Sequence, residues 1–155
     1  MSTEMVNHPK HYNNHPSNIE AIEVIRSMSF NIGNTFKYVY RRNDKNHVIQ
    51  DLKKSIWYIE DEIKRREKWG YTFFAKLFTP LFYLGRQDLY TEYKHRGELI
   101  DEIIKHEQSF LCARIYRLLH RADIEFWDTT SLRAVKACLD SMITEEQFYL
   151  YGGEV

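Results

Sequence analysis

Apolar residues recur at helical spacing through most of the chain. Ile19 and Ile22 lie three residues apart, and Ile32, Phe36 and Val39 follow at spacings of four and three. The longest stripe covers more than four turns: Val48, Leu52, Ile56, Ile59 and Ile63. Steps of three or four residues are the period of an amphipathic helix, and strand alternation is not sustained anywhere. The pattern predicts an all-α fold.

Capping residues and helix breakers divide this pattern into elements. Ser17 with Glu20 fits a capping box, Asp44 can cap a helix that ends near Gly70, and Pro80 interrupts the apolar stretch that follows. The expected helices span about 18–28, 31–42, 44–69, 88–107, 109–122, 130–142 and 144–151, with one or two short helices between Gly70 and Gly85. Candidate caps for the later helices are Asp88, Thr129 or Thr130, and Thr144 with Gln147.

The chain has the length of one compact domain. Its 155 residues can bury roughly two-thirds of the surface of the unfolded chain, so the fold does not need disulfide bonds or a structural metal for stability. Residues 1–16 lack a helical period and predict an extended N-terminal arm. We expect a helical domain over 17–69, with a helical C-terminal extension over 70–155 packed on it as one globular unit.

Composition narrows the classes of partner. The 22 basic and 22 acidic residues cancel, so nucleic acid is an unlikely ligand and no overall field attracts an anionic membrane. No run of about 20 apolar residues predicts a membrane span, and Met1 to Lys10 lack the apolar stretch of a signal peptide. Only Cys112 and Cys138 are present, which does not suggest a disulfide framework. These features predict a cytoplasmic protein.

Aromatic side chains are crowded into the stretch broken by Pro80. They are Tyr71, Phe73, Phe74, Phe78, Phe82 and Tyr83. A small monomer would bury all of them with difficulty, whereas a closed homo-oligomer would cover them. We therefore expect the chain to self-associate.

Two rows of polar residues are the main candidates for chemistry. The chain has no phosphate-loop, dinucleotide-turn, H-E-x-x-H or C-x-x-C motif. One row is Asn34, Lys37, Tyr38 and Arg41; the other is Asp51, Lys54 and Tyr58, both at helical spacing. Lysine and arginine bind phosphate oxygens, tyrosine can stack on a base, and an aspartate can orient a cation or hold a ribose hydroxyl. The alternative is that each residue is exposed and paired along its own helix.

The predicted arm adds a second group. His8, Lys10, His11 and Tyr12 occupy four of five consecutive positions. A metal site built from His8, His11 and His15 is not predicted, because no acidic partner lies nearby and the intervening prolines do not set the three on one face.

Four sequence blocks resemble the SaV-like family of phage proteins. They are V-N-H-P-K-H-Y at Val6 to Tyr12, I-E-A-I-E-V-I at Ile19 to Ile25, F-N-I-G-N-T-F-K-Y-V-Y-R at Phe30 to Arg41, and D-L-K-K-S-I-W-Y-I at Asp51 to Ile59. They stand in the family's order and spacing and cover about residues 6–66. The family includes a nucleotide kinase of a short-tailed coliphage that phosphorylates deoxynucleoside monophosphates without a phosphate loop. Two positions differ from the family: Arg42 to His47 replace a glycine-rich basic turn, and Ser55 replaces a small alanine.

The resemblance and the polar rows together predict a phage nucleotide-binding protein, a deoxynucleoside monophosphate kinase in the host cytoplasm. The residues expected to be catalytic are His11, Lys37, Arg41 and Asp51; those expected to bind substrate are His8, Lys10, Tyr12, Glu20, Asn34, Tyr38, Lys54 and Tyr58. We expect Lys37, Arg41 and Lys54 to contact phosphates, Tyr12 or Tyr58 the base, and His11 or Asp51 to handle a proton. A nucleoside triphosphate would be the donor, and Mg²⁺ could assist.

Two other functions fit the sequence less closely. An all-α nucleotide pyrophosphohydrolase would use the E-x-x-E pair Glu20 and Glu23 with the acidic run at 60–62 to hold Mg²⁺, but a second E-x-x-D element is absent. A non-catalytic phage accessory protein would bind a nucleotide signal or a host protein.

Overall fold

The computed structural model describes residues 15–43, 47–68 and 86–152, and these ranges contain six helices and no strand. In chain order the helices are α2 (Ala21–Ile25), α3 (Phe30–Tyr40), α4 (Val48–Lys68), α6 (Gln87–His106), α7 (Phe110–Ile124) and α8 (Thr129–Tyr151). The predicted all-α fold is confirmed. Most of the expected arm and the aromatic stretch from Tyr71 to Tyr83 lie outside the described residues. In the ranges that are described, no helix combines the length and apolar character needed to cross a membrane.

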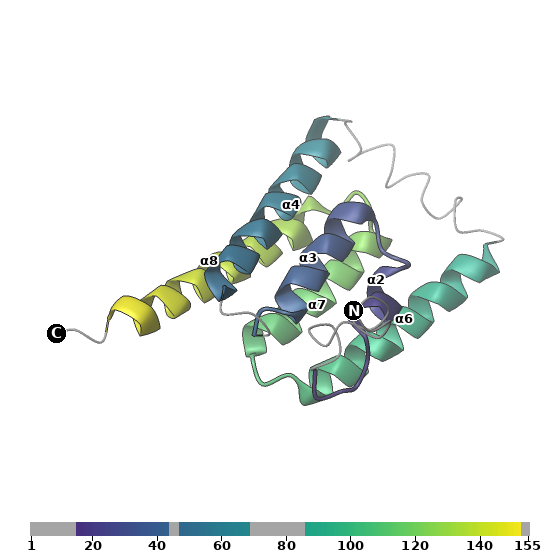
Figure 1. Cartoon of the computed structure of the whole chain (residues 1–155). Coiled ribbons are helices and arrows are strands. Elements are labelled where there is room, and N and C mark those ends of the chain that lie inside the picture. The colour runs from purple at the N-terminus through teal and green to yellow at the C-terminus, as the bar shows by residue number, and fades with distance from the viewer. Residues whose placement is uncertain (1–14, 44–46, 69–85, 153–155) are drawn as a thin grey trace, which may run out of the picture.

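Four helices form a ring in which neighbours run antiparallel. α3 packs on α4, α4 on α8, α8 on α7, and α7 on α3, while α2 and α6 lie on one side of this ring (Figure 1). The direction of α3 against α4 follows from two contacts, Arg41 with Asp51 and Asn31 with Asp61. Helices from both halves of the chain therefore share one bundle.

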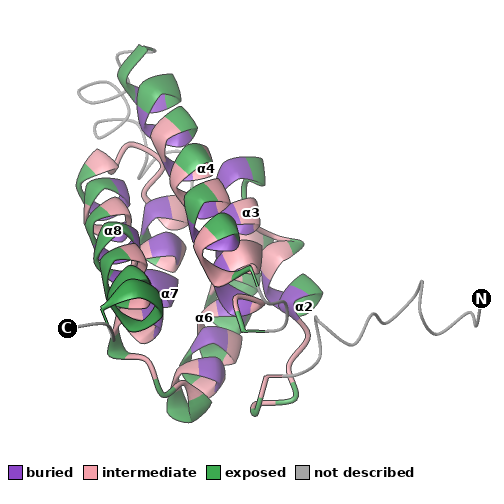
Figure 2. Ribbon diagram, turned by 60° about the vertical axis from the view of Figure 1, so that its left-hand side comes forward, coloured by how far each residue is buried: buried purple, intermediate pink, exposed green. Residues whose placement is uncertain are grey.

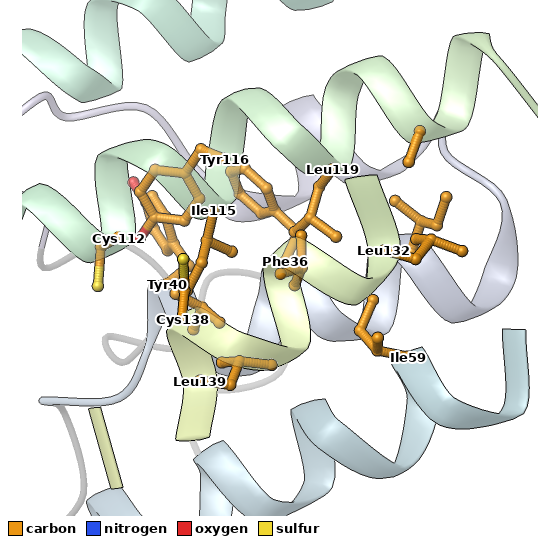
Figure 3. Packing of buried hydrophobic residues seen from close by; sticks show 14 of the residues in the cluster. Phe36, Tyr40, Ile59, Cys112, Ile115, Tyr116, Leu119, Leu132, Cys138 and Leu139 are labelled. Carbon is orange, nitrogen blue, oxygen red and sulfur yellow. The ribbon is translucent and has the colours of Figure 1, made fainter. Parts of the chain in front are cut away.

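The ring encloses a core built from the predicted apolar stripes (Figure 3). Phe36 of α3 and Tyr116 of α7 meet at its centre, with ring centroids 4.8 Å apart. The fully buried residues packed with them include Ile32, Leu52, Ile59, Leu119, Leu132 and Leu139. Each such side chain contributes roughly 1.5–3 kcal/mol on burial, so the stripes account for most of the drive to assemble the ring.

The first helix is shorter than expected and begins later. Ser17 is not its cap, because the Ser17 hydroxyl accepts a hydrogen bond from the Ile19 backbone N–H in a turn where Asn18 has a φ of 56°. α2 instead has Glu20 as its N-cap residue, and the Glu23 carboxylate accepts a hydrogen bond of 2.9 Å from the Glu20 backbone N–H. The capping box is thus shifted by three residues along the chain.

The two helices expected over 130–142 and 144–151 are one helix, α8. Thr144 does not interrupt it, since its hydroxyl donates to the Asp140 carbonyl of the preceding turn at 3.0 Å. Asp128 caps this helix in place of Thr129 or Thr130, accepting hydrogen bonds from the backbone N–H groups of Thr130 and Ser131. Similarly, Asp88 does not cap α6 but lies in its first turn, paired with Arg86 at 3.0 Å.

A buried arginine ties α6 to the rest of the fold. Arg96 is 1% exposed, lies 2.8 Å from Asp123 of α7 and donates to the backbone carbonyl of Ser27. Its Nε also donates to Nδ1 of His120 at 3.1 Å, which places the proton of the neutral His120 ring on Nε2. Burial and, to a lesser extent, the charge on Arg96 lower the pKa of His120 to about 4, although Asp123 and Asp101 oppose the shift.

This network predicts acid sensitivity of the fold. Below the usual histidine pKa of about 6.5 the unfolded chain binds a proton at His120 before the folded chain does, so stability falls as the pH drops from 6.5 to about 4. Between pH 6.5 and 4, His120→Gln should reduce the fall in the free energy of unfolding by up to about 3 kcal/mol. Urea unfolding at several pH values in that range measures it. His95→Gln, at a side chain that is 69% exposed, should leave the curve unchanged. Parallel curves for wild type and His120→Gln would contradict the assignment.

Candidate functional site

The antiparallel pairing of α3 and α4 sets the two predicted polar rows opposite each other. Arg41 Nε lies 3.1 Å from Asp51 Oδ2, and its Nη2 lies 3.4 Å from Oδ1. Lys54 Nζ lies 3.0 Å from the same Oδ1, and Lys37 Nζ donates to the Asn34 side-chain oxygen at 2.6 Å. We call Lys37, Arg41 and Lys54, together with Asp51, the cationic cluster.

One tyrosine ring lies under all three cations. The distances to the Tyr38 ring centroid are 4.7 Å from Lys37 Nζ, 4.4 Å from Arg41 Cζ and 5.3 Å from Lys54 Nζ. The negative face of an aromatic ring attracts a cation at such distances. Tyr38 therefore helps to hold together like charges that would otherwise repel each other.

The charges of the cluster do not balance among the described side chains. Three basic groups surround the single carboxylate of Asp51, whose side chain is 5% exposed. Burial lowers the pKa of Lys37, and Arg41 and Lys54 lower it as well, with only Asp51 acting in the opposite direction. A site with these properties stabilises an added anion, because the anion offsets the repulsion between the cations.

An aromatic patch adjoins the cluster on the same surface. Tyr38 stacks on Tyr58 with centroids 5.9 Å apart and planes 20° apart, and Phe30 and Trp57 meet the Tyr58 ring edge-on. Phe30 is 75% exposed and Trp57 is 61% exposed. We call these four residues the aromatic patch. Flat, exposed rings are suited to stacking on a planar ligand.

The sequence interpretation did not include Phe30 and Trp57 in the site. Both could have been found, because Phe30 is four residues before Asn34 and Trp57 is three residues after Lys54. Each thus continues a row already identified.

The structure brings together seven of the residues predicted for the site. They are Asn34, Lys37, Tyr38, Arg41, Asp51, Lys54 and Tyr58. Glu20 instead occupies the half-buried N-cap position of α2. His8, Lys10, His11 and Tyr12 lie outside the described residues, so their expected roles stay predictions.

The two departures from the family pattern have different structural consequences. Ser55 is fully buried between α3 and α4, and its hydroxyl donates to the Asp51 carbonyl at 3.1 Å, so it serves as a small residue at a close helix contact. Arg42 points away from the cationic cluster and forms two hydrogen bonds with Glu107, of 2.9 and 3.2 Å. Arg42 is therefore not a phosphate ligand of the cluster.

A polar hollow adjoins this Arg42 pair. It has a volume of about 540 Å³ and is lined by residues of the α3 end and the α6–α7 connection, among them Asn43 and Ser109. Burial would raise the pKa of Glu107, but the hydrogen bonds and charge of Arg42 outweigh burial and hold that pKa below its usual value. His15 stacks on Tyr40 above Glu107, with centroids 4.8 Å apart. The carboxylate thus fastens the α6–α7 connection to α3.

The carboxylates considered for a pyrophosphohydrolase are engaged in other contacts. Glu23 accepts from the Glu20 backbone, and the buried Glu62 lies 2.6 Å from Arg65 and 2.7 Å from Arg66. Within residues 15–43, 47–68 and 86–152, no three His, Cys, Asp or Glu side chains are grouped closely enough to hold a metal ion.

Comparison with known proteins gives a family match for the N-terminal part. A family described as a protein of unknown function (DUF3310) matches residues 6–60, about a third of the chain. No curated protein and no solved structure matches significantly. The matched range contains every residue of the cationic cluster and the aromatic patch, so both belong to the part of the chain that is similar to this family.

Proposed function

We propose that the α3–α4 surface binds a nucleotide, with its phosphates on the cationic cluster and its base on the aromatic patch. The observation that carries the proposal is the set of three cations around one tyrosine ring and one carboxylate, directly beside exposed aromatic rings. Arginine offers phosphate a planar fork and lysine a mobile point charge, so the cluster contains both kinds of side chain that bind phosphate.

The layout matches the two ends of a nucleotide. Tyr58 lies one turn from Lys54, a rise of about 6 Å along α4. A base stacked against Tyr58, Phe30 or Trp57 would direct its sugar along the helix and its phosphate toward Lys54 and Arg41. Stacking of this kind contributes roughly 1–3 kcal/mol per base and depends weakly on base identity.

We further propose that the chain is a deoxynucleoside monophosphate kinase without a phosphate loop, and the resemblance to SaV-like phage proteins supports this class. An oxygen of the bound monophosphate attacks the terminal phosphorus of a nucleoside triphosphate. The bond from that phosphorus to its bridging oxygen breaks, and the electron pair leaves with the nucleoside diphosphate. This transfer requires positioning and charge neutralisation more than covalent participation of the protein, which suits a site made of Lys37, Arg41 and Lys54.

Product analysis tests this assignment. Each deoxynucleoside monophosphate is titrated into the protein by calorimetry and then incubated with a nucleoside triphosphate, with and without Mg²⁺, before separation by ion-exchange chromatography. We expect a measurable heat of binding for at least one monophosphate and formation of its diphosphate in step with loss of the donor.

Other products would overturn the kinase assignment in distinguishable ways. Monophosphate and pyrophosphate from a triphosphate alone would indicate a pyrophosphohydrolase. Binding without turnover would indicate an accessory protein that binds a nucleotide signal. No heat with any nucleotide would show that the α3–α4 surface is not a nucleotide site and would favour a host-protein partner.

A further inference from the structure

The last two turns of α8 extend beyond α7, while the start of α4 still lies near them. Cys112 near the start of α7 contacts Met142 of α8 at 3.9 Å between their sulfur atoms, so α7 begins opposite this part of α8. The apolar stripe of α8 is buried up to Met142, and its continuation reaches Tyr149 and Leu150, which are exposed. A stripe that supports the core for three turns therefore continues onto the surface.

This end of the bundle carries an apolar patch, which we call the end patch. Its members are Phe148, Tyr149, Leu150 and Tyr151, which are 60–80% exposed. Figure 2 shows the exposed turns of α8 beside the C-terminal end of the described chain. Large side chains of this type bury 150 Å² or more each, so the patch offers roughly 500 Å² of apolar surface per copy. Two copies together reach about 1,000 Å², the size from which specific interfaces form.

A hollow of about 880 Å³ lies next to the end patch, between the end of α8 and the start of α4. One wall carries Leu150, Tyr151 and Glu146 of α8, and the other carries Lys53 of α4 and His47, the residue before α4. The α8 side of the hollow is therefore acidic, at Glu146, and the α4 side is basic, at Lys53. We call them the acidic edge and the basic edge. A two-fold axis through this surface would set the acidic edge of each copy against the basic edge of the other, as an isologous contact requires.

We propose that the end patch is the interface of a homodimer in which the end of α8 from one copy fills the hollow of the other. The second copy is the occupant because apolar surface and opposite charges are self-complementary across one two-fold axis. The end patch lies outside the range matched by the family, whereas the α4 side of the hollow, with Lys53, lies inside it. No residue of the cationic cluster or the aromatic patch lines the hollow. It does not depend on the proposed nucleotide binding.

Light scattering coupled to size exclusion tests the proposal on the full chain at micromolar concentration. Wild type should elute with the mass of a dimer. The double variant Phe148→Ser, Tyr151→Ser should be monomeric, with the dimer dissociation constant raised at least a hundredfold. Circular dichroism should be unchanged, since both side chains are exposed. Tyr90→Ser, at a 64% exposed tyrosine on α6, is the matched control and should remain dimeric.

A charge exchange tests the pairing across the interface. Lys53→Glu alone should weaken the dimer, and adding Glu146→Lys should restore it, because the exchanged charges again lie opposite each other. A monomeric wild type, a dimer unaffected by the double serine variant, or a failure of the exchange to restore association would each overturn the proposal.

Discussion

Replacing Arg66 by methionine is expected to destabilise the fold by about 3–5 kcal/mol, the usual cost of removing one partner of a buried ion pair. Arg66 is 2% exposed, and its Nε lies 2.7 Å from Glu62 Oε1. Its Nη1 donates to the backbone carbonyls of Ala122, Glu125 and Asp128, at 3.0 to 3.3 Å. The Ala122 carbonyl lies in the last turn of α7, and those of Glu125 and Asp128 lie in the connection to α8, so Arg66 joins α4 to the α7–α8 connection.

Arg65 supplies a matched control on the same helix. It also pairs with Glu62, at 2.6 Å, but its side chain is 44% exposed. Arg65→Met should cost less than about 1 kcal/mol, because solvent screens the exposed pair and Arg66 still neutralises Glu62. Urea unfolding of both variants measures the difference. Arg66→Lys should recover only part of the loss, since a single ammonium nitrogen cannot replace both the Nε that holds Glu62 and the Nη1 that holds the carbonyls. Equal costs at the two positions would contradict this account of the buried arginine.

The sequence predicted the long elements and the site rows because both depend on helical periodicity. The stripe from Val48 to Ile63 and the rows ending at Arg41 and Tyr58 follow from steps of three and four residues, and the structure places them as that geometry requires. Which way two neighbouring helices run then decides whether the rows meet. The short connection between the helices expected over 31–42 and 44–69 favours antiparallel neighbours, and this could be read from the chain.

The buried charges could not be predicted in the same way. The sequence around Arg66 and Arg96 is as polar as that of an exposed helix face. Their burial depends on carbonyls and carboxylates far away in the sequence. Thr144 was wrongly predicted to begin a helix, because a threonine that can cap a helix can also donate to the preceding turn inside one. Local patterns identify helices, whereas partners from distant segments decide which polar groups are buried.

The helices after residue 86 support the α3–α4 surface without contributing to the cationic cluster. Lys136 of α8 reaches Glu60 of α4 at 3.6 Å, and Arg42 is held by Glu107. The first contact fixes α4 against α8, and the second fixes the end of α3 against the α6–α7 connection. A binding site on two helices whose backs are packed in this way keeps its geometry when a ligand arrives.

Arg41→Ala is expected to reduce the rate of the proposed phosphoryl transfer about a hundredfold or more, a loss of roughly 2–4 kcal/mol of transition-state stabilisation. Arg41 is 11% exposed, holds both oxygens of Asp51 and lies 4.4 Å from the Tyr38 centroid, so its fork is already oriented in the cluster. A bound phosphate would share this fork with Asp51. Removing it deletes a charge-assisted contact and leaves Asp51 paired with Lys54 alone.

The variant should still fold, because Lys54 keeps the Asp51 carboxylate partly neutralised. Circular dichroism and thermal unfolding establish this before nucleotide titrations and turnover are compared. Arg41→Lys should recover only part of the activity, since an ammonium keeps the charge and loses the planar fork. Arg117→Ala, at an exposed position of α7, serves as the control for loss of an arginine and should titrate like wild type. If well-folded Arg41→Ala and Arg41→Lys both bind and turn over nucleotides like wild type, Arg41 is a structural partner of Asp51 and the cationic cluster is not the phosphate site.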